Sequence, residues 1–354
     1  MALGAGVVSS ALAEETPATE APKKAAKPIN PLLETCLKPA DTQAIVVSCT
    51  TAIESRQLQG EALAAALYRR GVAQGTRGQL PAAVNDFSAG LKLSPDATDL
   101  LNARASAYGA MKRYDLAIQD YSALLKLIPD DADSHYLRAR SASALGKDDA
   151  AIADLTAVLA KEKGDINALM DRGGLYLRQG KFDQADADFS ALIKVEPKAA
   201  AAFYNRGRAK FLRGDFAAAS KDFAAAETFR DGNPYAALRR YFSNAQGKGD
   251  GKSRAQADIL TEAIAKFPPD QWPMPILSTL VGQTTEKNLL ASAATVGDKA
   301  VARQLDAEVH YYLGEAAILK KDTKTARAHF AAAAKGDRNV IEVVDAGWRL
   351  KQLP

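Results

Sequence analysis

The side chains that most often carry acid–base or phosphate chemistry are few and scattered in this chain. His135, His310 and His329 are its three histidines, and they fall in separate helical segments, where we expect packed or half-exposed side chains. A Gly- and Lys-rich stretch at 247–252 lacks the preceding strand and the Gly-Lys-Ser/Thr ending of a phosphate-binding loop, so we interpret it as a flexible turn. No G-x-S-x-G or H-E-x-x-H motif occurs. We therefore predict no catalytic residue, no metal site and no cofactor; the alternative is an enzyme that uses the 247–252 turn on phosphates.

The two cysteines could form a disulfide bond. Cys36 and Cys49 stand 13 positions apart at the start of the expected folded region. In an oxidising compartment they would close a loop and stabilise an N-terminal hairpin by roughly 3 kcal/mol. If the chain is not exported, they are two buried free thiols instead. The pair suits no zinc site, because no histidine or further cysteine lies near it.

The first residues are typical of an exported protein. Residues 1–13 are small and apolar and end in an A-x-A-type signal-peptidase site, Ala11-Leu12-Ala13. We interpret this segment as a signal peptide that is trimmed at its start, since it lacks a positively charged beginning; a disordered Ala-rich start is the alternative. Residues 14–31 are rich in Pro, Ala and Lys and read as a flexible linker. No lipobox precedes either cysteine, so we expect a soluble periplasmic protein without a lipid anchor.

Charge and hydropathy argue against two further classes of protein. Lys and Arg number 46 and Asp and Glu 42, for a net charge of +4, whereas a nucleic-acid-binding protein concentrates basic charge on one face. No apolar run reaches the ~18–20 residues that a membrane-spanning helix requires. We expect neither a nucleic-acid partner nor a membrane span.

A period of 34 residues governs the middle of the chain. Small residues recur at one position of the period, as Ala83, Ala117, Ala151, Ala185 and Ala219. Four positions later stands an aromatic residue or Leu, in the order Phe87, Tyr121, Leu155, Phe189 and Phe223. A second column of small residues comprises Gly71, Ala105, Ala139, Gly173 and Gly207. A period of 34 with these residue types resembles the tetratricopeptide repeat, a helix–turn–helix unit in which small residues let two helices approach closely.

The resemblance predicts an all-α protein, a tetratricopeptide-repeat right-handed superhelical solenoid with a C-terminal capping helix. The expected parts are a degenerate N-terminal helical hairpin at 32–63, five tetratricopeptide repeats at 64–233, a degenerate sixth repeat at 234–271, and a C-terminal helical region at 272–354 with a last repeat and the capping helix. Repeats one to five are the segments 64–97, 98–131, 132–165, 166–199 and 200–233. The capping helix is expected at 339–353, with its apolar residues Ile341, Val344, Trp348 and Leu350 against the solenoid.

Two charged columns follow the same period. The seventh position of each repeat is Arg, as Arg70, Arg104, Arg138, Arg172 and Arg206, and the twenty-third is Asp, as Asp86, Asp120, Asp154, Asp188 and Asp222. A binding site would not be copied identically into every unit, so we predict a structural ladder of ion pairs within or between units.

Positions 2, 5, 9, 12 and 13 of each repeat line the concave wall of such a solenoid. Their side chains become more aromatic and basic toward repeats three to five, and Tyr, Met and Arg are enriched in binding hot spots. The predicted partner-binding groove comprises Tyr68, Tyr136, Arg140, Met170, Leu177, Arg178, Tyr204, Arg208 and Phe211. We expect it to bind an extended or helical peptide with apolar anchors and some acidic character, and we expect charge reversal of Arg140, Arg178 and Arg208 together to abolish binding without loss of helicity. Packing alone is the alternative role for these tyrosines.

The C-terminal segment 308–353 carries a more specific pattern. E-x-x-Y-Y-L-G (Glu308 to Gly314) is followed by Asp322, Ala326 and Phe330. This segment resembles the tail of NlpI-type periplasmic adaptors, helical and often dimeric scaffolds that bring a periplasmic protease together with cell-wall hydrolases. The resemblance implies a non-enzymatic adaptor of the bacterial cell envelope whose partners are periplasmic enzymes or envelope proteins. The alternative is a structural protein that self-assembles, as a homodimer through 272–354, and binds no peptide.

Overall fold

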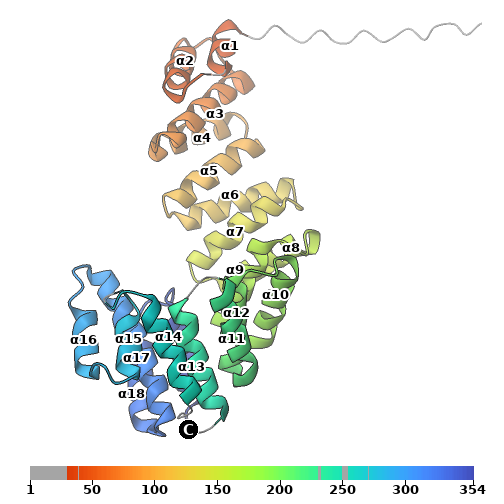
Figure 1. Ribbon diagram of the computed structural model, residues 1–354. Coiled ribbons are helices and arrows are strands. Elements are labelled where there is room, and N and C mark those ends of the chain that lie inside the picture. The colour runs from red at the N-terminus through yellow and green to blue at the C-terminus, as the bar shows by residue number, and fades with distance from the viewer. Residues whose placement is uncertain (1–29, 39, 230–232, 249–253, 270) are drawn as a thin grey trace, which may run out of the picture.

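The molecule is a stack of helical hairpins, as the computed structural model shows in Figure 1. The described residues are 30–38, 40–229, 233–248, 254–269 and 271–354. They form nineteen helices and no strand, and each helix packs against the next along the chain. The predicted all-α solenoid is therefore confirmed.

Some predicted features fall beyond these ranges. The signal peptide at 1–13, most of the linker (14–29) and part of the Gly/Lys turn (249–252) lie outside the described residues. Of the helices that are described, none is both long and apolar enough to span a bilayer.

Repeats one to five are consecutive helical hairpins. Their helices are α3 (Gly60–Thr76) and α4 (Leu80–Leu93), α5 (Thr98–Ala110) and α6 (Tyr114–Leu127), α7 (Ala132–Ala144) and α8 (Asp148–Lys161), α9 (Ile166–Arg178) and α10 (Phe182–Val195), and α11 (Ala200–Arg213) and α12 (Phe216–Phe229). Helix α3 begins before residue 64, where the period places the start of repeat one, because Leu63 and its neighbours pack against α2.

Close approach between the two helices of a repeat depends on the small residue at position eight. In repeat four, a Cβ on Gly173 would lie 2.7 Å from the Phe189 ring, and Phe189 is fully buried. The same contact recurs between Gly71 and Phe87 and between Gly207 and Phe223. Small residues and aromatic rings thus interlock as the 34-residue period predicts.

The predicted ladder of ion pairs is also present, and it lies within repeats. Each position-seven Arg donates Nε and Nη2 to both carboxylate oxygens of the position-23 Asp at 2.7–2.9 Å, in the pairs Arg70–Asp86, Arg104–Asp120, Arg138–Asp154, Arg172–Asp188 and Arg206–Asp222. The Nη1 of each Arg donates to a hydroxyl of the preceding unit, for example Arg138 to Ser122 at 3.0 Å. The ladder therefore joins the helices of one repeat and also neighbouring repeats.

The N-terminal end is closed by a short hairpin, α1 (Pro31–Leu37) and α2 (Thr42–Glu54). A disulfide joins Cys36 and Cys49, and both side chains are fully buried beside Leu33 and Ile45. The bond ties α1 to α2, which packs in turn on α3.

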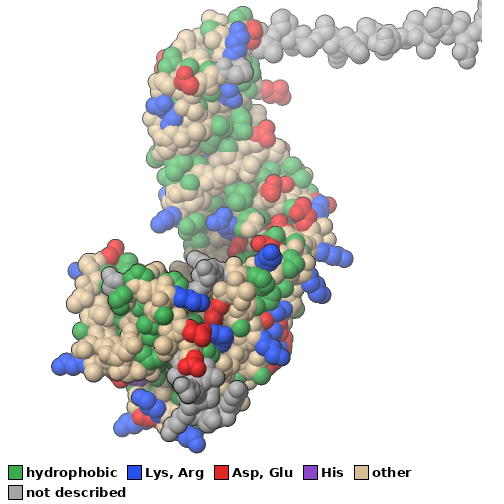
Figure 2. All heavy atoms as spheres, in the orientation of Figure 1, with side chains coloured by type: hydrophobic (Ala, Val, Ile, Leu, Met, Phe, Trp, Pro, Cys, Tyr) green, Lys and Arg blue, Asp and Glu red, His purple; other side chains and the backbone are tan. Residues whose placement is uncertain are grey.

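Beyond repeat five the chain forms α13 (Pro234–Lys248), α14 (Arg254–Lys266), α15 (Met274–Leu280), α16 (Glu286–Ala294), α17 (Lys299–Leu319), α18 (Thr323–Ala333) and α19 (Ile341–Gln352). Figure 1 shows α13–α18 gathered beside α11 and α12, so that this end of the molecule is broader than the N-terminal stack. Figure 2 shows hydrophobic side chains exposed along α4–α7 and charged side chains gathered at the edge formed by α8 and α10.

Helix α19 closes this end and also returns to the inner face of the repeats. It packs on α17 and α18, and its other side contacts α11 of repeat five. Its most buried residues include the charged Glu342, Asp345 and Arg349, whereas Ile341 is 37% exposed. Trp348 and Leu350 pack against the core as expected, whereas Ile341 does not, and ion pairs add to the attachment of this helix.

Candidate functional site

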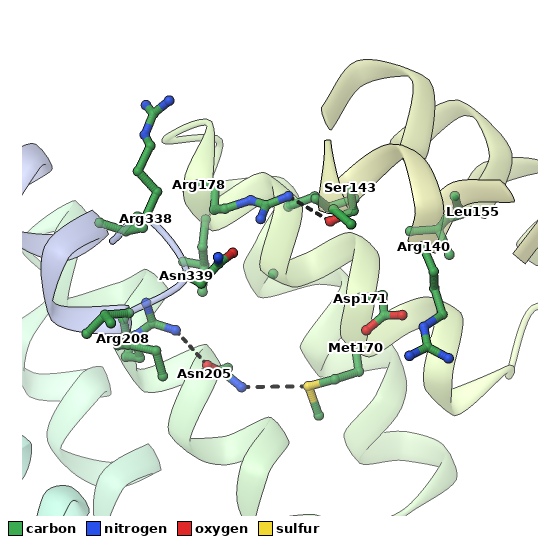
Figure 3. A pocket seen from close by; sticks show the side chains of 18 residues that line it. Arg140, Ser143, Leu155, Met170, Asp171, Arg178, Asn205, Arg208, Arg338 and Asn339 are labelled. Carbon is green, nitrogen blue, oxygen red and sulfur yellow. Dashed lines mark hydrogen bonds between the residues drawn. The ribbon is translucent and has the colours of Figure 1, made fainter. Parts of the chain in front are cut away.

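A pocket of about 430 Å³ opens on the inner face of repeats three to five. One wall is formed by α7 and α9, the floor by α9 and α11, and the opposite wall by the loop before α19 and its first turn (Figure 3). The lining residues used below are Arg140, Met170, Asp171, Arg178, Asn205 and Arg338. The pocket therefore lies where the sequence predicted a groove, but part of its wall comes from the C-terminal segment.

Tyr136 and Arg140 stand one helical turn apart on α7. The Tyr136 hydroxyl donates to Asp171 Oδ2 at 3.1 Å, and burial together with the nearby Asp171 carboxylate raises the pKa of Tyr136 to about 12. Burial likewise raises the pKa of Asp171. The Arg140 side chain is exposed, with its guanidinium carbon 6.0 Å from the centre of the Tyr136 ring.

The floor combines an apolar thioether with an amide. Met170 and Asn205 meet at 3.6 Å between Sδ and Nδ2, and Asn205 Oδ1 accepts from Arg208 Nη1 at 2.8 Å. Met170 is half-buried, so its side chain remains in contact with the pocket. A flexible thioether beside fixed polar groups suits an apolar side chain of variable shape.

Arg178 lines both this pocket and a second one of about 400 Å³. Its Nη2 donates to Ser143 Oγ at 2.8 Å and to Asp148 Oδ1 at 2.6 Å. Trp348 of α19 lines the second pocket and packs edge-on against Phe182, with ring centres 5.7 Å apart. The Arg178 charge is thus neutralised within the chain, which the sequence did not indicate.

Arg208 is not available to a partner, contrary to the sequence prediction. Its Nε and Nη2 donate to Asp345 of α19 at 3.2 and 2.8 Å, and the Arg208 side chain is 6% exposed. Arg239 of α13 donates to the same carboxylate at 2.8 Å and to Glu342 at 3.2 Å. Burial alone would raise the pKa of Asp345, but the two guanidinium groups outweigh it and lower this pKa.

Two more predicted groove residues are buried. Leu177 is 1% exposed and Phe211 is fully buried. Phe211 packs against Phe216 with ring centres 5.2 Å apart, and the Arg349 guanidinium carbon lies 5.3 Å from its ring centre. Phe211 therefore belongs to the core, which corrects its assignment, whereas the buried Leu177 still borders the main pocket.

The remaining predicted groove residues are spread along the inner face. Tyr68 lies in α3, against Phe87, well before the pocket in the stack. Tyr204 lines a separate cavity of about 840 Å³ between repeat five, α13 and α17, together with Tyr235 and Trp272. Both Tyr235 and Trp272 donate to Glu308 Oε2, at 3.0 and 2.7 Å. The structure thus brings together at one pocket Arg140, Met170, Leu177, Arg178 and Arg208. Tyr136 lies next to this pocket, beside Arg140, and Tyr68 lies away from it.

Sequence reasoning missed a histidine pair. His310 and His329 lie with their Nδ1 atoms 2.9 Å apart. They occupy positions 4 and 23 of the last repeat-like unit, the same columns that place His135 Nδ1 2.8 Å from Asp154 in repeat three. The equal spacing of 19 residues in both pairs was the signal that could have found this contact.

Stacked hairpins with a lined inner face define the class of protein as a helical-repeat solenoid. The tetratricopeptide repeat family matches residues 68–132, 102–166, 136–183 and 170–237, so this part of the chain consists of tetratricopeptide repeats. No curated protein matches the sequence.

Two solved structures resemble most of the chain. The C-terminal part of a TPR repeat-containing protein from Cytophaga hutchinsonii is 16% identical, with a TM-score of 0.52, over 79% of this chain and 98% of that one. A tetratricopeptide repeat protein from Parabacteroides merdae is also 16% identical, with a TM-score of 0.50, over 81% of this chain and 97% of that one. At this identity the likeness establishes the fold alone.

Proposed function

We propose that this protein is a non-enzymatic interaction scaffold that binds a peptide or helix of a partner protein on the inner face of repeats three and four. The observation that carries this proposal is the pocket beside α7 and α9. The half-buried Met170 and the exposed Arg140 line this pocket, and the half-buried Tyr136 lies beside it, with its hydroxyl on the lining residue Asp171. Tyr, Met and Arg at the centre of a concave surface are typical of residues that anchor a partner.

We further propose that the protein works in the periplasm as an adaptor. A disulfide buried at the N-terminal end is typical of an oxidising compartment, in agreement with the signal-peptidase site in the sequence. The link to a protease or to cell-wall enzymes rests on the resemblance of 308–353 to NlpI-type adaptors.

The residues behind that resemblance have a structural role here. Tyr311 and Tyr312 are fully buried, and Tyr311 accepts a hydrogen bond from Arg239 Nη1 at 2.7 Å. The motif therefore holds the C-terminal helices together and does not itself identify the partner.

Selection from a random peptide library displayed on phage tests the binding site. The full-length protein is the bait, Met170→Glu is the groove variant, and Lys221→Glu on the exposed outer side of α12 is a control for added negative charge away from the groove. We expect the selected peptides to bind the native protein and Lys221→Glu equally, and to bind Met170→Glu at least tenfold more weakly by fluorescence anisotropy. Circular dichroism shows that the variants are folded. If no peptide is enriched, or if Met170→Glu binds as well as the control, the proposed site is wrong.

Self-assembly through 272–354 is the competing proposal. Light scattering on full-length protein at 10–100 µM, an ordinary working range, separates the two. A stable dimer that shields the pocket, together with the absence of peptide binding, would favour it.

A further inference from the structure

The inner face of this solenoid presents the same two side chains twice. Tyr136 and Arg140 of repeat three recur as Tyr204 and Arg208 of repeat five, at positions five and nine of the period. Because each repeat places its first helix on the inner wall in the same way, the two pairs offer a ligand the same chemistry. The two pairs differ in the part of the chain that covers them.

Repeat five already has an occupant, the chain's own α19. Asp345 lies on Arg208 with both carboxylate oxygens engaged, and Asp345 is fully buried. The helix also presents Trp348, which rests on the turn of repeat four and leaves no room for a Cβ on Gly180. A helix that offers one carboxylate and one large apolar side chain is therefore a form of ligand that this inner face binds.

Repeat three has no such occupant. Within the described part of the chain, the Arg140 guanidinium has no ion-pair partner, and neither does that of Arg338. Figure 3 shows these two side chains on opposite sides of the pocket. The other guanidinium groups at the pocket are neutralised, Arg178 by Asp148 and Arg208 by Asp345. Asp171, the acidic residue on the pocket wall, accepts a hydrogen bond from Tyr136, so the two guanidinium groups without an ion-pair partner outnumber the carboxyl groups of the lining and favour an anion.

The space in front of Arg140 continues along the wall. Arg140 and Ala144 border both the main pocket and a further one of about 400 Å³ over α5 and α7. Gly109 and Gly174 lie on this wall and have no side chain that projects from it. A Cβ on either would meet nothing within 4 Å and would therefore extend into open space. On the opposite side of the main pocket, Val344 and the 37% exposed Ile341 of α19 form an apolar wall. A row of small residues with an apolar flank lets the backbone of a helix approach closely.

We propose that the partner segment is an acidic amphipathic helix, which lies beside α19, sets a carboxylate on Arg140 as Asp345 is set on Arg208, and places an apolar side chain against Met170 and Val344. This inference rests on the proposed function and specifies the ligand of the same site. Arg338 closes the site from the opposite side as a second, weaker contact for acidic residues. Helix α19 is itself a fixed wall of the site, because its buried ion pairs attach it to α11 and α13.

A charge-reversal cycle with full-length protein tests the proposal. The probes are the peptides selected on the native protein and their variants in which each Asp or Glu is replaced singly by Lys. We expect one acidic position whose replacement weakens binding at least tenfold, with partial recovery on Arg140→Glu protein. Lys221→Glu, the same change of charge on the outer side, should leave both affinities unchanged. Circular dichroism of the peptides should show helix formation on binding.

The outcomes separate this inference from the proposed function. Peptides that depend on Met170 but bind Arg140→Glu as tightly as native protein would overturn the acidic-helix proposal and leave the binding site intact. Peptides that bind in an extended form, without a helical signal, would overturn it as well. Failure to select any peptide counts against the proposed function itself.

Discussion

Two stretches of the same inner face behave differently in this protein. At repeat three, Tyr136 is half-buried and Arg140 is exposed, whereas at repeat five the equivalent Arg208 is closed in by α19. The local sequence of the two helices is similar, so the difference comes from a contact with a segment 137 residues away. The C-terminal helix of a repeat solenoid can thus cover one part of the inner face and leave an equivalent part exposed.

The comparison also shows how a mainly charged surface can attach a helix. Asp345 and Glu342 face Arg208 and Arg239, and Arg349 donates to Glu315 at 2.7 Å. Buried ion pairs add little net stability when complete, but removal of one partner is costly because it leaves an uncompensated buried charge.

Asp345→Ala should have the largest effect. It leaves Arg208 and Arg239 buried without their shared carboxylate, and removing one partner of a buried ion pair costs about 3–5 kcal/mol. Both tryptophans, Trp272 and Trp348, lie in the C-terminal region, so urea unfolding followed by tryptophan fluorescence reports on the occupied stretch.

Asp133→Ala is the matched control, an exposed Asp on the inner helix of repeat three. It should shift the unfolding free energy by less than about 0.5 kcal/mol. Equal unfolding curves for Asp345→Ala and this control would show that α19 does not depend on its ion pairs.

Loss of the disulfide should destabilise the opposite end. Closing a loop of this length contributes about 3 kcal/mol, and the bond joins only α1 to α2. The double variant Cys36→Ser, Cys49→Ser should show faster amide hydrogen exchange in 31–54, while its tryptophan transition stays that of the native protein. A matching change in the tryptophan signal would mean that the two ends unfold together.

The sequence predicts contacts well where they are local and repeated. The Gly173–Phe189 contact and the Arg138–Asp154 pair each join residues 16 apart within one repeat, so the period alone determines them. The location of α19 could not be predicted in this way. It depends on a single distant pairing, and a helix that buries Asp345 departs from the apolar pattern by which amphipathic helices are recognised. For the same reason the sequence could not show that α19 covers Arg208 while Arg140 stays exposed.

Charge reversal of Arg140, Arg178 and Arg208 together illustrates the consequence. Reversal of Arg208 would place a carboxylate against the buried Asp345, and reversal of Arg178 would do so against Asp148. Loss of binding in that variant would report damage to the fold as well as to the site. Arg140→Glu alone tests the site.

Helix packing beside the open pocket can be tested at two adjacent glycines of α9. Gly173→Ala places a Cβ 2.7 Å from the buried Phe189 ring, and such overpacking costs about 1–3 kcal/mol, which the higher helix propensity of Ala offsets by up to about 1 kcal/mol. Gly174→Ala meets nothing within 4 Å and should stabilise the helix by about 0.5–1 kcal/mol. Thermal unfolding by circular dichroism should therefore shift in opposite directions; a shift of the same sign for both would show that the contact with Phe189 is not what requires a small residue.

The smallest effect concerns pH and lies in the occupied, C-terminal part of the molecule. Burial lowers the pKa of His329 below its usual 6.5, and the neighbouring His310 lowers it further, although Glu286 acts in the opposite direction. The unfolded chain therefore binds a proton more readily than the folded one, so stability is intact above about pH 7 and falls as the pH drops below the usual histidine value. The two Nδ1 atoms share a hydrogen bond at 2.9 Å. If both rings were protonated, each Nδ1 would carry a hydrogen and neither could accept, so this hydrogen bond would be lost.

We expect the native protein to lose roughly 1 kcal/mol between pH 7.5 and pH 5.5 relative to His329→Gln, as measured by the urea midpoints of tryptophan fluorescence. The variant cannot titrate at position 329 in this range, and the comparison removes the opposite trend of Glu227, whose burial raises its pKa to about 7. The stability of the variant at pH 7.5 should be slightly lower because the hydrogen bond to His310 changes. The same dependence on pH in both proteins would remove the histidine pair as a cause. A similar fall in peptide affinity at repeat three would in addition show that the two stretches of the inner face are coupled, whereas a constant affinity would show that the open stretch functions independently of the end that closes its neighbour.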